Sequence, residues 1–169
     1  MKKTLQILNS LVESGIINEY AIAGGMAQFY YIEPSVTYDL DLIVNFKDTD
    51  NSLTPLTSLY EWAKENKLKS EGEHIIIGGI PVQFLLPYNN LISEALENRA
   101  RIKIFEENTF IVKAEYLMAI MLQTGRATDK ERLLRFFIEA AYNEKVFLDI
   151  LKRFELVEQY NRFKEHYHG

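Results

Sequence analysis

The sequence predicts an α+β protein in which a mixed β-sheet with flanking helices is followed by a C-terminal helical bundle. Short apolar runs bounded by glycine or proline alternate with helical patterns up to residue 112, and only helical patterns follow. A chain of 169 residues with 47% hydrophobic residues can bury a substantial core. We therefore predict an α/β core over residues 1–112 and a helical subdomain over residues 113–169. No Pro/Gly/Ser-rich linker separates the two parts, so we expect them to pack together.

Strands and helices are predicted to alternate up to residue 66. A helix over residues 4–14 is indicated by Leu5, Leu8, Leu11 and Val12 on one face, with Gly15 at its end. The next elements are a strand over 20–23, a helix over 25–31 that Pro34 ends, a strand over 39–44 and a helix reaching about residue 66. Thr54 and Pro55 are the expected N-cap and first residue of that last helix.

Two β-hairpins are predicted in the second part of the core. The first joins apolar strands at 74–77 and 80–86 around Gly78-Gly79. The second joins strands at 101–105 and 109–112, with Glu107 and Asn108 at the turn. Between the hairpins, Asn89 or Asn90 is expected to cap a helix.

Four helices are predicted after residue 112. The first covers residues 115–124 and ends at Gly125. The segment from Thr128 to Glu131 has the form of a capping box, which would begin the second helix. Asn143 is expected to cap the third helix, and the fourth covers about residues 156–167.

Composition excludes several classes of function. The chain has no cysteine, so disulfides and thiolate zinc sites are excluded. Its net charge is −5, with 9 Lys+Arg against 15 Asp+Glu in residues 1–112, which disfavours nonspecific nucleic-acid binding. The segment MKKTLQILNSLVESG has a broken apolar pattern unlike a signal peptide, and no apolar run is long enough to span a bilayer. We expect a cytoplasmic protein without a membrane partner.

A candidate site lies between Gly24 and Asp41. In a strand, the alternation Asp39-Leu40-Asp41-Leu42 places both carboxylates on one face, about 7 Å apart along the backbone. Such a pair can converge on a hard divalent cation, Mg²⁺ or Mn²⁺, which also relieves the repulsion between them. Gly24-Gly25 at a strand-to-helix junction lets a phosphate approach the backbone and the helix N-terminus. Separately these features would indicate a solvated strand face and a turn, but together they favour a metal-phosphate site.

The run AGGMAQFYYIEPSVTYDLDLIV resembles the first motif of the nucleotidyltransferase superfamily. That motif has Gly-Gly or Gly-Ser at a helix start, then roughly a dozen residues, then Asp-apolar-Asp/Glu-apolar. The placement of Ala27 and of Thr37-Tyr38-Asp39 resembles the branch of AbiEii-type toxins and minimal nucleotidyltransferases. The segments GGIPVQFLLPY and YLMAIMLQTGRATDKERLLRFF resemble later blocks, so the likeness spans most of residues 20–140.

This resemblance implies roles for individual residues. It implies a metal at Asp39 and Asp41, and a nucleoside triphosphate at Gly24, Gly25, Thr37, Arg126 and Lys130. The implied reaction transfers a nucleoside monophosphate from the triphosphate to a hydroxyl of RNA, protein or a small molecule. A toxin-like role is also implied, with an antitoxin or a homodimer as the protein partner.

The sequence departs from the family pattern at the third carboxylate. The matching position holds Gln83, between Val82 and Phe84. Glutamine can orient a water or a ribose hydroxyl, but it cannot deprotonate an acceptor, and two-metal catalysis uses a full carboxylate set. The alternative hypothesis is therefore a catalytically degenerate nucleotide-binding or interaction module of the same fold. If Gln83 lies away from the two aspartates, Glu71 or Glu73 could take the third position.

Other polar residues are interpreted as structural. Arg99, Arg101 and Lys103 alternate, which favours a solvated strand face over a phosphate-contacting stripe. His74 stands alone before an apolar strand and is interpreted as a structural residue.

Overall fold

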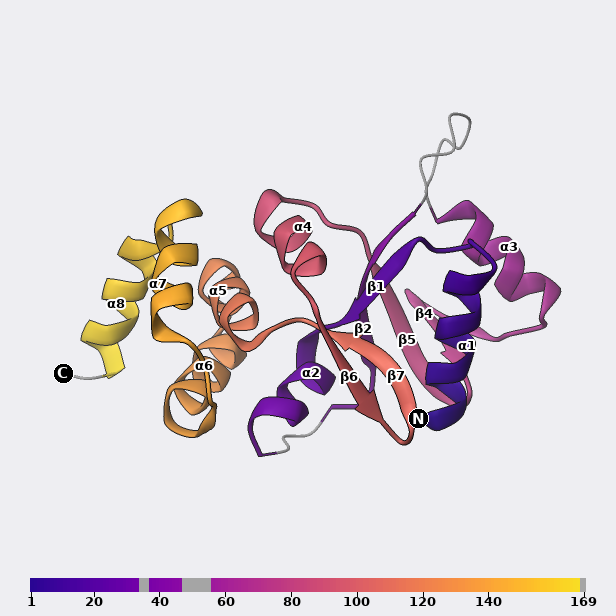
Figure 1. The fold of residues 1–169 in the computed structure, drawn as a ribbon, viewed down its shortest axis with the longest axis horizontal. Helices are drawn as coiled ribbons and strands as arrows, with labels where there is room; N and C mark the ends of the chain where they lie inside the picture. The colour runs from indigo at the N-terminus through magenta and orange to yellow at the C-terminus, as the bar shows by residue number, and fades with distance from the viewer. Residues whose placement is uncertain (34–36, 47–55, 168–169) are drawn as a thin grey trace.

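The computed structural model, which describes residues 1–33, 37–46 and 56–167, has one mixed sheet followed by a group of helices (Figure 1). The seven strands of the described chain lie in the order β3-β4-β5-β2-β1-β7-β6. They are β1 Glu19–Ile22, β2 Leu40–Asn45, β3 Ser70–Glu71, β4 His74–Ile77, β5 Ile80–Leu85, β6 Ala100–Ile104 and β7 Glu107–Ile111. The helices are α1 Lys2–Glu13, α2 Gly24–Tyr31, α3 Thr57–Glu65, α4 Asn90–Glu97, α5 Ala114–Thr124, α6 Ala127–Glu139, α7 Glu144–Arg153 and α8 Val157–Tyr167. This architecture confirms the predicted α+β class.

The central strand β2 pairs antiparallel with β1 and parallel with β5. Leu40 and Leu42 are fully buried, whereas Asp41 between them is partly exposed. The alternation predicted for this strand is therefore confirmed, although the strand begins at Leu40 and Asp39 immediately precedes it. A polar face and an apolar face are thus defined at the middle of the sheet.

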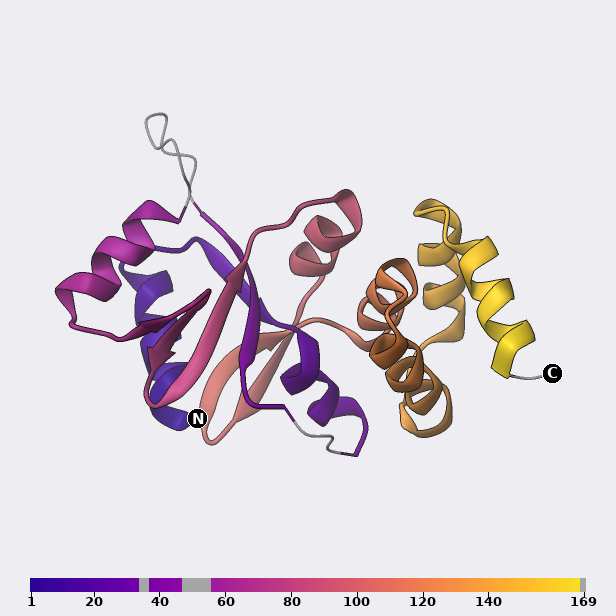
Figure 2. The same ribbon diagram turned by 180° about the vertical axis from the view of Figure 1, so that it is seen from behind.

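Helix α1 packs against the sheet through its apolar stripe and through side-chain hydrogen bonds. Its buried residues Leu5, Leu8 and Leu11 follow the predicted helical spacing. Thr4 Oγ1 donates a hydrogen bond to the carbonyl of Ile77 in β4. The hydroxyl of Tyr20 in β1 donates to Asn9 on α1. Figures 1 and 2 show α1 and α3 at one end of the molecule and α5–α8 at the other.

The C-terminal helices are joined to the core through α4 and α2. Glu94 on α4 accepts hydrogen bonds from Tyr116 on α5 at 2.6 Å and from Arg153 on α7. The hydroxyl of Tyr31 on α2 donates to the carbonyl of Val112, just before α5. Phe137, Tyr142, Phe147, Tyr160 and Phe163 pack their rings together across α6, α7 and α8.

Several predicted boundaries are confirmed. Asn89 accepts a hydrogen bond from the amide of Ile92 as N-cap of α4, and Asn143 accepts from Val146 as N-cap of α7. Gly125 ends α5 in the left-handed conformation. The short strand β3 was not predicted, because its two exposed residues have no apolar pattern. Predictions at Pro34, Thr54 and Pro55 lie outside the described residues.

The turn of the second hairpin was predicted at the wrong residues. Ile104 pairs with Glu107, so the turn consists of Phe105 and Glu106 rather than of Glu107 and Asn108. Both turn residues have positive φ, 50° and 66°, which is the conformation of a two-residue hairpin loop. Glu107 and Asn108 lie in β7 instead, where Gln6 and Asn9 of α1 donate hydrogen bonds to them.

The prediction for the start of α6 was also wrong. The helix begins at Ala127 with Arg126 in the N-cap position, so Thr128 to Glu131 is not a capping box. The carboxylate of Asp129 is buried and accepts a hydrogen bond from the Arg126 side chain. This pair, rather than a Thr–Glu exchange, closes the first turn of the helix.

No helix in the described ranges is both long and apolar enough to cross a membrane.

Candidate functional site

Asp39 and Asp41 lie together at the start of β2, on the face opposite to the buried leucines. Burial raises the pKa of Asp41, and repulsion from Asp39 raises it further. His74, Arg132 and Arg126 face the same carboxylate and partly oppose this rise in the pKa. The acidic pair is thus an electrostatically unfavourable arrangement that gains from a bound cation.

Of the two glycines predicted to bind phosphate, Gly24 lies against Asp41 and Gly25 lies against Thr37. A Cβ added at Gly24 would lie 1.9 Å from Asp41 Oδ2, and one added at Gly25 would lie 2.7 Å from Thr37 Oγ1. Thr37 in turn donates a hydrogen bond to Asp39 Oδ1 at 3.0 Å. The structure therefore brings together five of the sequence-predicted site residues at the N-terminus of α2. The free amides of that helix end and the two carboxylates share one small region.

A polar row crosses the sheet beside Asp41. The parallel pairing of β2 and β5 places Gln83 opposite Asp41, and the antiparallel pairing of β4 and β5 places His74 opposite Gln83. Cross-strand partners point to the same face of a sheet, so the three side chains lie in one row. The amide of Gln83 donates a hydrogen bond to Glu73 Oε2 at 2.7 Å. Gln83 therefore shares the face of Asp41, and its side chain is held by a nearby carboxylate.

His74 lies at the site beside Asp39. The sequence had been interpreted as giving this histidine a structural role only. Its Nε2 lies 3.6 Å from Asp39 Oδ2 and makes no hydrogen bond within the described structure. The sequence contains a signal for this position. The two-residue turn Gly78-Gly79 fixes the register of the hairpin, so that His74 must stand opposite Gln83.

Helix α6 presents two arginines toward the acidic face. Arg126 Nε donates to Asp129 Oδ2 at 2.7 Å, and Arg132 approaches Asp129 at 4.0 Å. Hydrogen bonding and attraction from Asp129 raise the pKa of Arg126, so this arginine stays charged. Asp129 is only 3% exposed and acts as a fixed anchor for both cations. Arg132 was not identified from the sequence, although its spacing of three from Asp129 places it on the same helix face.

An open cavity of about 400 Å³ lies beside Asp39. Its lining consists of Thr37, Tyr38, Asp39, Glu71, His74, Pro81 and Arg132. The volume falls in the range of small-molecule sites. Tyr38 is 84% exposed at this site, which leaves an aromatic face available to a ligand.

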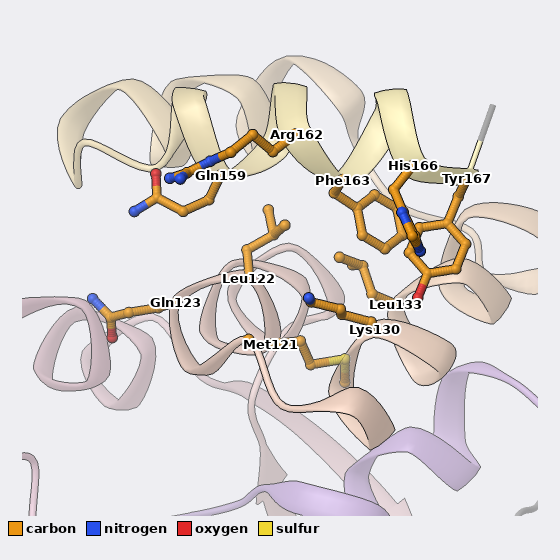
Figure 3. A pocket seen from close by; sticks show the side chains of 11 residues that line it. Met121, Leu122, Gln123, Lys130, Leu133, Gln159, Arg162, Phe163, His166 and Tyr167 are labelled. Carbon is orange, nitrogen blue, oxygen red and sulfur yellow. The ribbon is translucent and has the colours of Figure 1, made fainter. Parts of the chain in front are cut away.

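Lys130 does not join this group of residues. It lines a different cavity, between α5, α6 and α8 (Figure 3). Arg126, Asp129 and Arg132 share one face of α6, and Lys130 lies on another. The structure thus separates Lys130 from the other predicted nucleotide-binding residues.

The carboxylates of Asp39 and Asp41 fit a cation that keeps part of its hydration shell. Within the described ranges, no cluster of three or more His, Asp or Glu is arranged to hold a metal. Asp39 and Asp41 could offer such a cation two carboxylates, and water and phosphate oxygens would complete its shell. Mg²⁺ prefers such a partial protein shell.

No family model matches the chain, and no curated protein matches it. Among solved structures, the crystal structure of an antigenic nucleotidyltransferase-like protein from Paracoccidioides brasiliensis is similar. The TM-score is 0.57 and the sequence identity 15%, over 94% of this chain and 92% of that chain. This similarity shows a nucleotidyltransferase-like fold, as the resemblance of the first motif predicted.

Proposed function

We propose that this nucleotidyltransferase-like chain transfers a nucleoside monophosphate from a nucleoside triphosphate to a hydroxyl group, with a divalent cation at Asp39 and Asp41. One observation carries the proposal. Gly24 and Gly25, at the N-terminus of α2, are in direct contact with the side chains of Asp41 and Thr37. A phosphate-binding helix end and a cation-binding pair side by side are what a metal-bound triphosphate requires.

The cation would have two carboxylate ligands from the chain. When bound, Mg²⁺ or Mn²⁺ supplies positive charge that neutralises the triphosphate and polarises the reacting phosphate. Thr37 orients Asp39 through its hydrogen bond, and the packing of Gly24 holds Asp41 in place. These contacts fix the two carboxylates before a ligand arrives, which lowers the entropic cost of binding.

In the proposed reaction, the acceptor oxygen forms a bond to the α-phosphorus, and the bond from that phosphorus to the bridging oxygen breaks. Pyrophosphate leaves, and the acceptor proton passes to water. Negative charge develops on the leaving group, so cations near it accelerate the reaction. Arg126 and Arg132, fixed by Asp129, face the acidic pair and are suited to this role.

A specific observation favours the alternative of a degenerate module. Gln83, rather than a carboxylate, lies beside Asp41 on β5, and its amide is bonded to Glu73. A neutral amide is a weak ligand for a second metal and cannot accept a proton from a hydroxyl. In this alternative the chain binds a nucleotide without transferring any part of it.

The proposal extends to the acceptor of the nucleoside monophosphate and to a protein partner of the chain. We propose RNA, a protein or a small molecule as the acceptor class. A toxin-like role of the AbiEii type, with an antitoxin or a homodimer as partner, is the most specific version, and it places the chain in the cytoplasm. Lys130 remains a predicted ligand contact only if the acceptor extends to its cavity.

The test uses each α-³²P-labelled nucleoside triphosphate with Mg²⁺ and either total cell RNA or cell lysate. We expect label on one acceptor class with the wild-type chain and none with Asp39→Asn/Asp41→Asn. The control Glu158→Gln/Glu165→Gln removes two exposed carboxylates from α8 and should transfer label normally. Nucleotide binding in calorimetry without label transfer would support the degenerate module. Failure of all four triphosphates to bind would overturn both versions.

A further inference from the structure

A second cavity, of about 410 Å³, lies within the helical part of the chain, between α5, α6 and α8 (Figure 3). Its lining consists of Met121, Leu122, Gln123, Gly125, Lys130, Leu133, Gln159, Arg162, Phe163, His166 and Tyr167. Figure 3 shows α8 on one side of this space and α5 with α6 on the other. The cavity therefore depends on the packing of three helices and is not a surface depression of one.

The charged residues of the lining are basic. Lys130 and Arg162 carry positive charge, Gln123 and Gln159 are neutral, and none of the lining residues is acidic. The ammonium group of Lys130 extends from α6 into the space between the helices (Figure 3). This local excess of positive charge stands out in a chain with a net charge of −5. A ligand that fits this charge carries an anionic group.

The rest of the lining is largely apolar. Leu122 on α5, Leu133 on α6 and Phe163 on α8 are at most 7% exposed and line the cavity from its two sides. Met121, also buried, lies next to them and can adapt its shape to a ligand. Apolar walls with a few polar groups are the usual composition of small-molecule sites. A ligand that fits them has an apolar body.

We propose that this cavity binds a small amphipathic anion, an aromatic or aliphatic body that carries one carboxylate, sulfonate or phosphate group. The apolar body lies against Leu122, Leu133 and Phe163, and the anionic group lies near Lys130 and Arg162. The volume suits a ligand of drug-like size. The site is distinct from the acidic pair, because Asp129 and Arg132 occupy another face of α6. The proposal is therefore independent of the proposed nucleotidyl transfer.

The test uses two fluorescent probes that differ only in one sulfonate group. 8-Anilinonaphthalene-1-sulfonate carries a sulfonate, and N-phenyl-1-naphthylamine lacks it. We expect saturable binding of the sulfonate probe at one site of the folded chain, with a lower affinity for the neutral probe. Lys130→Gln/Arg162→Gln should weaken binding of the sulfonate probe about tenfold and leave the neutral probe almost unchanged, because the two cations that can pair with the sulfonate are lost.

The control Lys113→Gln/Lys152→Gln makes the same change in net charge outside the lining, and it should leave both affinities unchanged. Circular dichroism melts of each variant separate a local loss of affinity from unfolding. Equal loss of affinity in the control, or no loss in the Lys130/Arg162 variant, would overturn the proposal. Binding that weakens as the protein concentration rises would also overturn it, since a second copy of the chain would then occupy the cavity.

Discussion

Gly24 and Asp41 are packed so closely that a methyl group at Gly24 would lie 1.9 Å from Asp41 Oδ2. The two residues belong to different elements, the first residue of α2 and the second of β2. Their contact links the helix end that can bind a phosphate to the strand that can bind a cation. Most of the expected consequences of substitution at this site derive from this contact.

Gly24→Ala is expected to abolish nucleotide binding. The added Cβ displaces the Asp41 carboxylate, and the φ of +55° costs about 1–2 kcal/mol for a residue other than glycine. Gly72→Ala is the matched control, because Gly72 has a φ of +59° with nothing within 4 Å of the added Cβ. Both variants should lose stability in urea melts, and only Gly24→Ala should lose affinity for the Mg²⁺-nucleotide in calorimetry. Equal nucleotide affinities would show that the contact has no functional role.

Asp41→Asn is expected to stabilise the metal-free chain. Burial and repulsion from Asp39 raise the pKa of Asp41, so the folded state holds the charged form unfavourably at neutral pH. The neutral amide removes this cost, and the Tm at about pH 7 should rise by about 2 °C or more. The gain should shrink as the pH falls through the raised pKa of Asp41, because the wild-type carboxyl then becomes protonated.

The same variant should respond differently to metal. Mg²⁺ at millimolar concentration should raise the Tm of the wild-type chain by mass action and leave that of Asp41→Asn unchanged. Asp149→Asn, on the exposed face of α7, serves as a control and should keep the wild-type response to Mg²⁺. A metal response that persists in Asp41→Asn would contradict the assignment of this carboxylate as a ligand.

Asp129→Asn is expected to weaken nucleotide binding through the arginines it holds. Loss of the carboxylate frees Arg126 from its 2.7 Å ion pair and removes the attraction on Arg132. We expect a dissociation constant about five- to thirtyfold higher, which corresponds to about 1–2 kcal/mol of charge-assisted hydrogen bonding. Arg132→Gln should produce a similar loss. Arg135→Gln, which breaks an exposed pair with Glu139 on the same helix, should bind nucleotide normally.

The cluster of Glu94, Tyr116 and Arg153 should give stability that depends on pH. Burial favours a higher pKa for Glu94, but hydrogen bonds from Arg153 and Tyr116 outweigh it and lower the pKa. The stability from this pair is therefore present above the ordinary glutamate pKa of 4.5 and is lost as the pH falls through the lowered value. Burial and the hydrogen bond to Glu94 raise the pKa of Tyr116 to about 12. A second loss of folding stability is therefore expected as the pH rises above 10.0.

Arg153→Gln tests this cluster. Urea melts should show a loss of about 0.5–1.5 kcal/mol at about pH 7. The loss should be almost zero at a pH below the lowered pKa of Glu94, where this carboxyl is protonated in the folded and in the unfolded state. Lys152→Gln, the neighbouring exposed residue, should show no loss at either pH. An equal loss of stability for Arg153→Gln at both pH values would mean that packing, rather than charge, joins α4 to α7.

The sequence predicted the parts of the site that depend on local pattern. Strand alternation placed Asp39 and Asp41 on one face, and the predicted helix start placed Gly24 and Gly25 at the N-terminus of α2. The strand β5 was expected to hold Gln83, and its pairing with β2 puts that residue beside Asp41. Caps at Asn89 and Asn143 also followed from local chemistry.

Features that depend on packing between distant segments were not predicted. The turn lies at Phe105 and Glu106, and the next two residues, in β7, accept hydrogen bonds from α1. Arg132 reaches the acidic pair only because α6 packs beside α2, where Tyr31 contacts Phe136. The same packing turns Lys130 toward α8. None of these relations has a signal within a single segment of the sequence.

Calorimetric titration of ATP, GTP, CTP and UTP with Mg²⁺ into the wild-type chain and into Asp39→Asn/Asp41→Asn is the decisive measurement of this site. We expect that at least one triphosphate binds the wild-type chain, that binding requires Mg²⁺, and that the double variant loses it. Nucleotide binding that is equally strong in the double variant, or in the absence of any divalent cation, would contradict the assignment of the acidic pair beside Gly24 as the metal-triphosphate site.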